Sequence, residues 1–432
     1  MFRVFKKNAV FKNSAIYMGT DAFSRAIAFL LLPIISKYLV PEQLGIAANF
    51  DVLQSILALL AGQAVVNSIP YFFYKMGKNE MAALITNLIY LIIILNVFFS
   101  CVILFSSGII EQYLKIKLWL QVLTVVSVIS MLITEIDKLV FRLEDKPYKF
   151  AILQLLQSFL YIGLQVVMVI FLEMQALGRI YSTVLSVGIV CVLHICILYK
   201  KGYIVFKYDR QSIEKLLKFG LPLLPHSISF WLKSGLDKVL LTTYCGLAVN
   251  GLYSMAMTFG AIYTMCEQSF SRAYTPYLQK RLSFINEQTE FVEKRKIVKM
   301  TYGFGVMFLL LLFLLIPSCW LVINNLVDDK YIPCFTFIPF ILIARTIHAY
   351  YSLIVEYIYT AQKTLGLGII TFSGSACQLL LTFLFVKGLG ASGINFSLIL
   401  GEVLIMLSVW YYSNKVYPMP WFSFFRKNET HF

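Results

Sequence analysis

The chain has 432 residues, of which 59% are apolar and 14% are charged, whereas a soluble domain carries about 25% charged residues. Mean hydropathy is +0.78. This composition has too little polar material to coat soluble domains, and it excludes a soluble enzyme, a secreted disulfide scaffold and a disordered chain. The net charge of +15 has to be assigned by location before it indicates any partner.

Apolar stretches long enough to cross a bilayer recur along the whole chain. A transmembrane helix needs about 20 apolar residues, and the stretches that qualify are 14–38, 44–68, 82–106, 118–140, 150–172, 177–199, 217–243, 247–272, 298–324, 333–360, 365–386 and 391–413. The first is too long for the apolar region of a signal peptide, so we interpret it as an uncleaved span. The ten-residue alternation of a β-barrel is absent from the sequence. We therefore predict an all-α integral membrane protein with 12 transmembrane helices in two six-helix bundles.

Lysine and arginine residues indicate the orientation. Most of the 37 basic residues lie in the N-terminal segment and in the connections that share its side of the membrane. Basic residues in short loops favour the cytoplasmic side, so we predict that the N- and C-termini are cytoplasmic. The charge excess then lies at a rim facing anionic lipid and indicates no nucleic acid.

The two halves of the chain resemble each other. The predicted division is an N-terminal bundle over 1–200, a cytoplasmic linker over 201–216 and a C-terminal bundle over 217–432. The segment Tyr38–Gly45 between the first two spans matches Tyr244–Gly251 between the seventh and eighth. A duplicated unit with an even number of spans keeps both halves in the same orientation, which is a transporter plan with a site between the halves.

Basic residues inside the spans are candidates for binding an anionic substrate, because each is costly in hydrocarbon. Arg25 and Arg345 lie near the middle of spans, and no acid lies three or four residues from Arg345. His348 shares a helix face with Arg345, although a lone histidine is also typical of packing. Arginine suits a diphosphate because its planar fork donates two parallel hydrogen bonds. The predicted cationic cavity comprises Arg25, Lys233, Arg345, His348 and Lys238.

Acids inside the spans are candidates for coupling transport to a proton or sodium gradient. They are Asp21, Asp237, Glu356 and Glu402. Two of them have an alternative role, since Asp21 lies four residues before Arg25 and Asp237 four residues after Lys233, where each pair could simply neutralise its charges. Among the other histidines, we interpret His194 as an interfacial residue.

Other kinds of chemistry find no support in the sequence. The eight cysteines are scattered without a CxxC motif, which suits neither zinc nor a disulfide framework. No phosphate-binding loop of the GxxxxGK[ST] type is present, so we expect neither ATP-driven transport by this chain nor any metal or cofactor.

Several motifs resemble a known family. Phe23-Ser24-Arg25, Pro33 and Tyr38–Gly45 resemble the first-span signature of Wzx-type O-antigen and capsule flippases, which belong to the multidrug/oligosaccharidyl-lipid/polysaccharide exporter superfamily. The second half agrees in Phe219–Pro222, Pro225, Asp237-Lys238, Asn250–Ser254 and Tyr274–Pro276. The family commonly has Asp-Arg where this chain has Asp237-Lys238, a difference that keeps the charge and loses the guanidinium fork.

The resemblance implies a function. It implies a secondary transporter, not an enzyme, that flips an undecaprenyl-diphosphate-linked oligosaccharide across the bacterial inner membrane by ion-coupled alternating access. It also implies two bundles in a V around a cationic cavity, with a lateral opening between the first and eighth spans and with Arg25 as the family's first-span arginine.

The expected partners are the lipid-linked glycan, membrane lipids, and a polysaccharide polymerase with its chain-length regulator, for a chain that we expect to be monomeric. Two alternatives stay open. A cation-coupled multidrug antiporter would not need the deep arginines, and a membrane-embedded polysaccharide polymerase or ligase would need a long outer loop that this sequence lacks.

Overall fold

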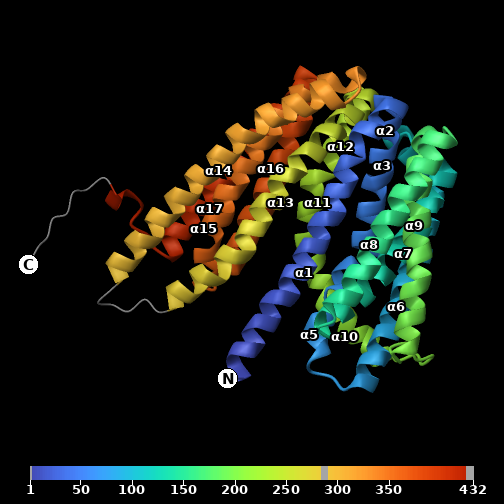
Figure 1. Ribbon diagram of the computed structural model, residues 1–432, viewed down its shortest axis with the longest axis horizontal. Coiled ribbons are helices and arrows are strands. Elements are labelled where there is room, and N and C mark those ends of the chain that lie inside the picture. Colours follow the sequence, from blue (N-terminus) through green and yellow to red (C-terminus); the bar gives the residue numbers. More distant parts are fainter. Residues whose placement is uncertain (1, 284–289, 425–432) are drawn as a thin grey trace, which may run out of the picture. The chain divides into compact units, whose positions relative to one another are not determined.

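The structure is a computed structural model that describes residues 2–283 and 290–424. Within its helices, the side chains of residues 2–11, 28, 226, 229, 230, 233, 234, 283, 423 and 424 lie outside the described part. Every regular element in these ranges is a helix (Figure 1), as hydrocarbon requires, because a helix satisfies its own backbone hydrogen bonds. The prediction of an all-α protein is confirmed.

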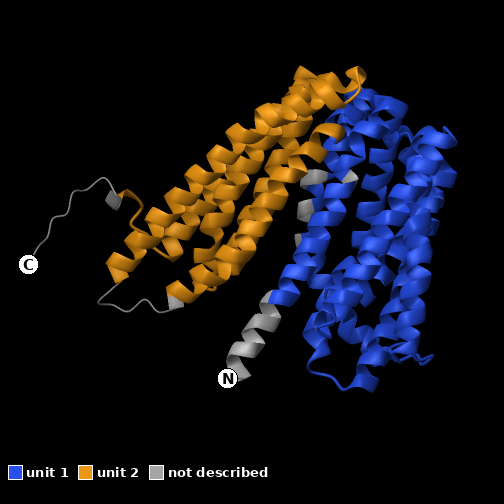
Figure 2. Cartoon of the chain, in the orientation of Figure 1, with its two compact units in different colours: residues 1–254 blue, residues 255–432 orange. Residues whose placement is uncertain are grey.

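Packing divides the chain into two compact units, residues 1–254 and 255–432 (Figure 2). The elements of the first unit are α1 (Phe2–Leu30), α2 (Leu32–Tyr38), α3 (Pro41–Ala58), the π-turn η1 (Leu59–Gln63), α4 (Ala64–Val66), α5 (Ile69–Phe73), α6 (Lys78–Leu114), α7 (Leu118–Leu143), α8 (Pro147–Gln165), the π-turn η2 (Val166–Phe171), α9 (Gln175–Lys200), α10 (Arg210–Gly220), the 3₁₀ turn η3 (Leu221–Leu223), α11 (Leu224–Ser234), α12 (Leu236–Cys245) and the first residues of α13 (Leu247–Ser283).

The second unit holds the rest of α13, followed by α14 (Glu290–Leu326), the 3₁₀ segment η4 (Asp329–Thr336), α15 (Ile338–Thr360), α16 (Thr364–Leu389), α17 (Ser392–Val416) and the 3₁₀ turn η5 (Trp421–Phe424). The predicted division into 1–200 and 217–432 stays a prediction, because it concerns repeats, whereas the two units are defined by packing.

Within the described residues, ten helical segments are long and apolar enough to cross a membrane. The chain is therefore a multi-pass membrane protein, and the count of twelve and the cytoplasmic termini stay predictions. The two predicted spans outside the ten are 217–243 and 247–272, the second of which is covered by α13. The first is interrupted at Gly235, where the helix ends as α11 and restarts as α12, with the Trp231 ring against the glycine.

The predicted linker is an ordered part of the first unit. Residues 203–209 run extended beside α6, where Thr86 Oγ1 accepts from the backbone N–H of Val205 at 2.9 Å. Asn87 donates to the carbonyl of Lys207 at 3.0 Å and accepts from the N–H of Asp209 at 2.9 Å. We call residues 201–209 the strap, and it leads directly into α10.

The duplicated motifs meet in the first unit. Gly45 lies against the carbonyl of Leu247, and Gly251 lies against the carbonyl of Pro41. Each glycine is the fifth residue of its helix, α3 or α13, and each contacts the first residue of the other helix. A reciprocal contact of this kind is consistent with the predicted duplication, and it requires glycine because a Cβ at either position would collide with backbone.

Replacing Gly251 with alanine tests this close contact. We expect Gly251→Ala to lower the free energy of unfolding by about 1–3 kcal/mol, because a methyl group forced into packed backbone strains it. The matched control is Gly188→Ala in α9, where nothing lies within 4 Å of the added atom and alanine is the better helix former. Thermal unfolding in detergent compares the two, and equal unfolding midpoints would show that the helices do not approach closely here.

Cysteine labelling tests the predicted orientation. In a chain freed of its eight native cysteines, we expect Lys117→Cys to react with an impermeant maleimide in right-side-out vesicles, because it follows α6 on the predicted outer side. Lys207→Cys, on the strap, should react only in inside-out vesicles. The reverse pattern would overturn the orientation.

Candidate functional site

The predicted residues on α1 do not form the alternative ion pair. Asp21 is half-buried and Arg25 is exposed, and no ion pair joins them within 4.0 Å in the described structure. Lys138 of α7, a nearby buried cation, donates its ammonium to Gln157 at 2.9 Å. The role of Arg25 in binding substrate stays a prediction.

Charged residues gather around Lys238 on α12. Its ammonium interacts electrostatically with Asp51 of α3, Arg179 of α9 and Asp237 beside it. Asp237 is buried and accepts a hydrogen bond from the Tyr253 hydroxyl at 3.4 Å. The predicted pair Asp237 and Lys238 is thus part of a mixed-charge group, to which Arg179 adds a second cation. The predicted Lys233 lies among the side chains outside the described part.

In the second unit, α15 and α17 bring two predicted residues together. His348 Nδ1 lies 3.4 Å from Glu402 Oε2, and the Glu402 side chain is only 5% exposed. The His348 ring stacks on Tyr351 with centroids 5.2 Å apart. Arg345, three residues before His348, forms no ion pair with any described acid. The predicted helix face therefore carries an imidazole paired with an acid and a guanidinium without one.

Glu356 is held by neutral donors. Its carboxylate is buried and accepts from Thr275 Oγ1 at 3.0 Å and from Gln279 Nε2 at 3.1 Å, both on α13. A buried carboxylate is costly without a paired cation, and among the described residues none forms an ion pair with it. Its predicted role in ion coupling stays a prediction.

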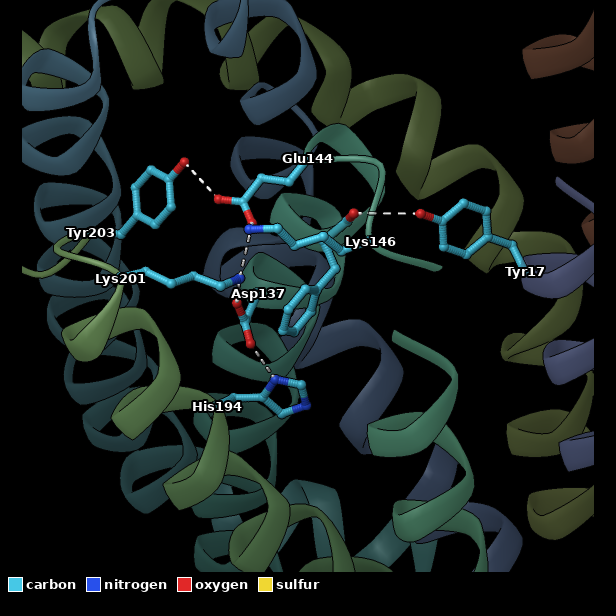
Figure 3. Close-up of polar contacts among 8 residues, drawn as sticks. Tyr17, Asp137, Glu144, Lys146, His194, Lys201 and Tyr203 are labelled. Atoms are coloured by element: carbon cyan, nitrogen blue, oxygen red, sulfur yellow. Dashed lines mark hydrogen bonds and ion pairs between the residues drawn. The ribbon is translucent and has the colours of Figure 1, made fainter. Parts of the chain in front are cut away.

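The structure also contains a charge network that the sequence reasoning missed (Figure 3). Asp137 of α7 is fully buried, with His194 Nδ1 of α9 at 2.7 Å from Oδ2 and Lys201 Nζ at 3.1 Å from Oδ1. Lys201 also lies 3.4 Å from Glu144 Oε2 and stands over the Phe141 ring at 3.5 Å. His194 is fully buried within the unit, and its place at the level of the membrane interface stays a prediction.

Glu144 links this network to the surface of the unit. It caps the C-terminal end of α7 and accepts from Lys146 at 2.9 Å and from the Tyr203 hydroxyl at 3.0 Å. Burial opposes ionisation of Glu144, but these two hydrogen bonds and the charge of Lys201 outweigh it and lower the pKa of the carboxyl. Glu144 therefore stays ionised at neutral pH, and it contacts Lys201 and Tyr203 at the start of the strap.

The family of the chain follows from comparison with known proteins. Residues 34–290 match the model of a family described as polysaccharide biosynthesis protein. The chain belongs to this family. The predicted resemblance is thereby confirmed at the level of the family.

Relatives and solved structures agree with this assignment. A protein of the Lsg locus of Haemophilus influenzae is 23% identical over 436 residues, covering 94% of this chain and 98% of the relative. An inward-facing multidrug resistance MATE transporter of the MOP superfamily has a TM-score of 0.68 at 16% identity and covers 90% of this chain and 94% of its own. The lipid II flippase MurJ, in an inward closed conformation, has a TM-score of 0.70 at 13% identity, with coverages of 92% and 87%. These likenesses establish the fold.

Removing the central cation of the network tests its energetic role. We expect Lys201→Met to lower the free energy of unfolding by about 3 kcal/mol, because it leaves Asp137 and Glu144 without their shared partner. The control is Lys200→Met, which removes an exposed neighbouring charge and should change stability by less than about 0.5 kcal/mol. Unfolding in detergent measures both, and equal losses would contradict the network's role.

Proposed function

We propose that this protein is a flippase, a secondary transporter that moves an undecaprenyl-diphosphate-linked oligosaccharide across the bacterial inner membrane. The cargo would be a repeat unit of O-antigen or capsule polysaccharide, and the driving force a proton or sodium gradient. Membership of a polysaccharide biosynthesis family and a fold shared with transporters support a transport step in glycan assembly.

The observation that carries the proposal is Arg345. It lies in the first half of α15, near the middle of the predicted span 333–360, and forms no ion pair with a described acid. A guanidinium in a membrane protein is costly unless a partner compensates it, and a diphosphate is a partner that matches its fork with two hydrogen bonds. Arg25 on α1 is exposed and also forms no ion pair with a described acid, so it is a second candidate for contact with an anionic headgroup.

Buried acids support ion coupling. Glu356 has only neutral hydrogen-bond donors around its carboxylate, and Glu402 has an imidazole beside it. Either carboxylate would change charge on taking up a proton or would bind a sodium ion. Such a change shifts a two-state transporter only as far as the ion binds one state better than the other.

A multidrug antiporter is the second candidate, because transporters of that kind share the fold. Arginines without acidic partners oppose it, since cationic drugs bind best among acidic and aromatic side chains. A polymerase or ligase is disfavoured because the connections on the predicted outer side are short, as between α6 and α7.

A complementation experiment tests the function. Deleting the gene should make a diphosphate-linked glycan accumulate on the cytoplasmic leaflet, and the wild-type chain should restore surface glycan. We expect Arg345→Ala to abolish surface glycan by losing the diphosphate contact while the protein still reaches the membrane, and Arg345→Lys to recover part of it by keeping the charge.

Surface glycan and membrane-fraction protein are measured together in each strain, with Lys200→Met as the control for a harmless loss of charge. Normal surface glycan in the Arg345→Ala strain would contradict the role of Arg345. Absence of any accumulated lipid-linked glycan, together with greater sensitivity of the deletion strain to cationic drugs, would favour the antiporter.

A further inference from the structure

In the buried pair of Asp137 and His194, only one of the two ring nitrogens of His194 contacts the carboxylate. Figure 3 shows His194 turning Nδ1 toward Asp137 and its other nitrogen away from the network. That Nε2 atom is buried and has no hydrogen-bond partner among the described residues. A buried acceptor left unpaired costs about 1–3 kcal/mol, and Nε2 is the position on this ring that is open to a proton.

Charge compensation in the network does not need a charged histidine. Asp137 already has Lys201 at 3.1 Å, and Glu144 has Lys146 at 2.9 Å and Lys201 at 3.4 Å. Two carboxylates are thus matched by two ammonium groups. With the imidazole neutral, Nδ1–H donates to Asp137 and Nε2 remains a free base, because the two ring nitrogens of neutral histidine divide these roles.

The groups run from the surface of the unit to its interior. The side chain of Lys146 is 43% exposed, those of Glu144 and Lys201 are 15% exposed, and those of Asp137 and His194 are fully buried. Neighbouring elements add other titratable groups, which are Glu135, Lys138 and Arg142 on α7, Tyr203 on the strap, and Tyr17 and Asp21 on α1. Among them, Glu135 pairs with Arg142 at 4.0 Å, and Lys138 donates a hydrogen bond to Gln157. We therefore take the imidazole of His194 as the group of this network that binds a proton.

We propose that His194 is a proton-binding site for the transport cycle, with Asp137 as its counter-ion. This rests on the proposed function of an ion-coupled flippase. The proton binds at Nε2, the ring becomes an imidazolium, and Nδ1–H continues to donate to the ionised Asp137. The same proton leaves from Nε2 when the cycle returns, so no other bond is formed or broken.

Lys201 connects this proton to movement of the chain. When His194 is charged, Asp137 has two cations, and repulsion between them favours Lys201 moving from Asp137 toward Glu144, which already lies 3.4 Å away. Lys201 begins the strap, whose later residues are bonded to Thr86 and Asn87 of α6 and which leads to α10 and α11. Proton binding therefore changes the ion pairs of Lys201, the first residue of the strap that joins the sixth and seventh predicted spans.

Nuclear magnetic resonance of ring-¹⁵N histidine tests the site directly, since the chain has only four histidines. In the full chain in lipid nanodiscs, one imidazole signal should be absent from His194→Gln and should change from the neutral to the charged pattern between pH 8 and pH 5. Substituting His226, His348 or His431 with Gln should leave that signal in place. A chain that keeps His194 as its one histidine provides the assignment if His194→Gln does not fold.

The counter-ion is tested by Asp137→Asn. Loss of the carboxylate should weaken proton binding at His194 by about tenfold or more, because an opposite charge this close favours the charged form. A His194 signal that stays in one form from pH 8 to pH 5, or a midpoint unchanged in Asp137→Asn, would overturn the proposal. This experiment uses no glycan, so it separates failure of the proton site from failure of the flippase assignment, which the deletion strain tests.

Discussion

The dominant constraint on this protein is that polar groups in hydrocarbon are stable only when they are paired. The backbone meets it by forming helices in every described regular element. Buried side chains meet it by linking helices, as Asn250 does with Asn49 at 2.8 Å and Thr242 at 3.0 Å, joining α13 to α3 and α12. Against this background, a basic group with no acidic partner stands out, and so the arginines carry the functional argument.

A second constraint is the close approach of two helices, α3 and α13, which each have a glycine as the fifth residue. Gly45 and Gly251 allow α3 and α13 to meet backbone to backbone, as small residues do between membrane helices. Next to this contact, Asn49 and Asn250 satisfy each other. Packing and hydrogen bonding thus fix the same pair of helices, and the two glycines occupy matching positions in the similar segments Tyr38–Gly45 and Tyr244–Gly251.

The sequence predicts some features well because they depend on composition alone. Apolar length predicts where the ten long apolar helical segments of the described residues lie. The break at Gly235 was not predictable, because one glycine inside an apolar run is usually tolerated and its effect depends on the Trp231 ring beside it. The network around Asp137 was missed because its members come from α7, α9 and the strap, far apart in sequence, with no local spacing to connect them.

Both halves place an imidazole–carboxylate pair between corresponding spans. In the first unit Asp137 of α7 pairs with His194 of α9, the fourth and sixth predicted spans. In the second, His348 of α15 pairs with Glu402 of α17, the tenth and twelfth. The acid and the base have exchanged helices, and the exposures differ, since the first pair is fully buried whereas the His348 side chain is 30% exposed. The Asp137 and His194 pair is therefore shielded within its unit, whereas the His348 and Glu402 pair, one turn from Arg345, is partly accessible.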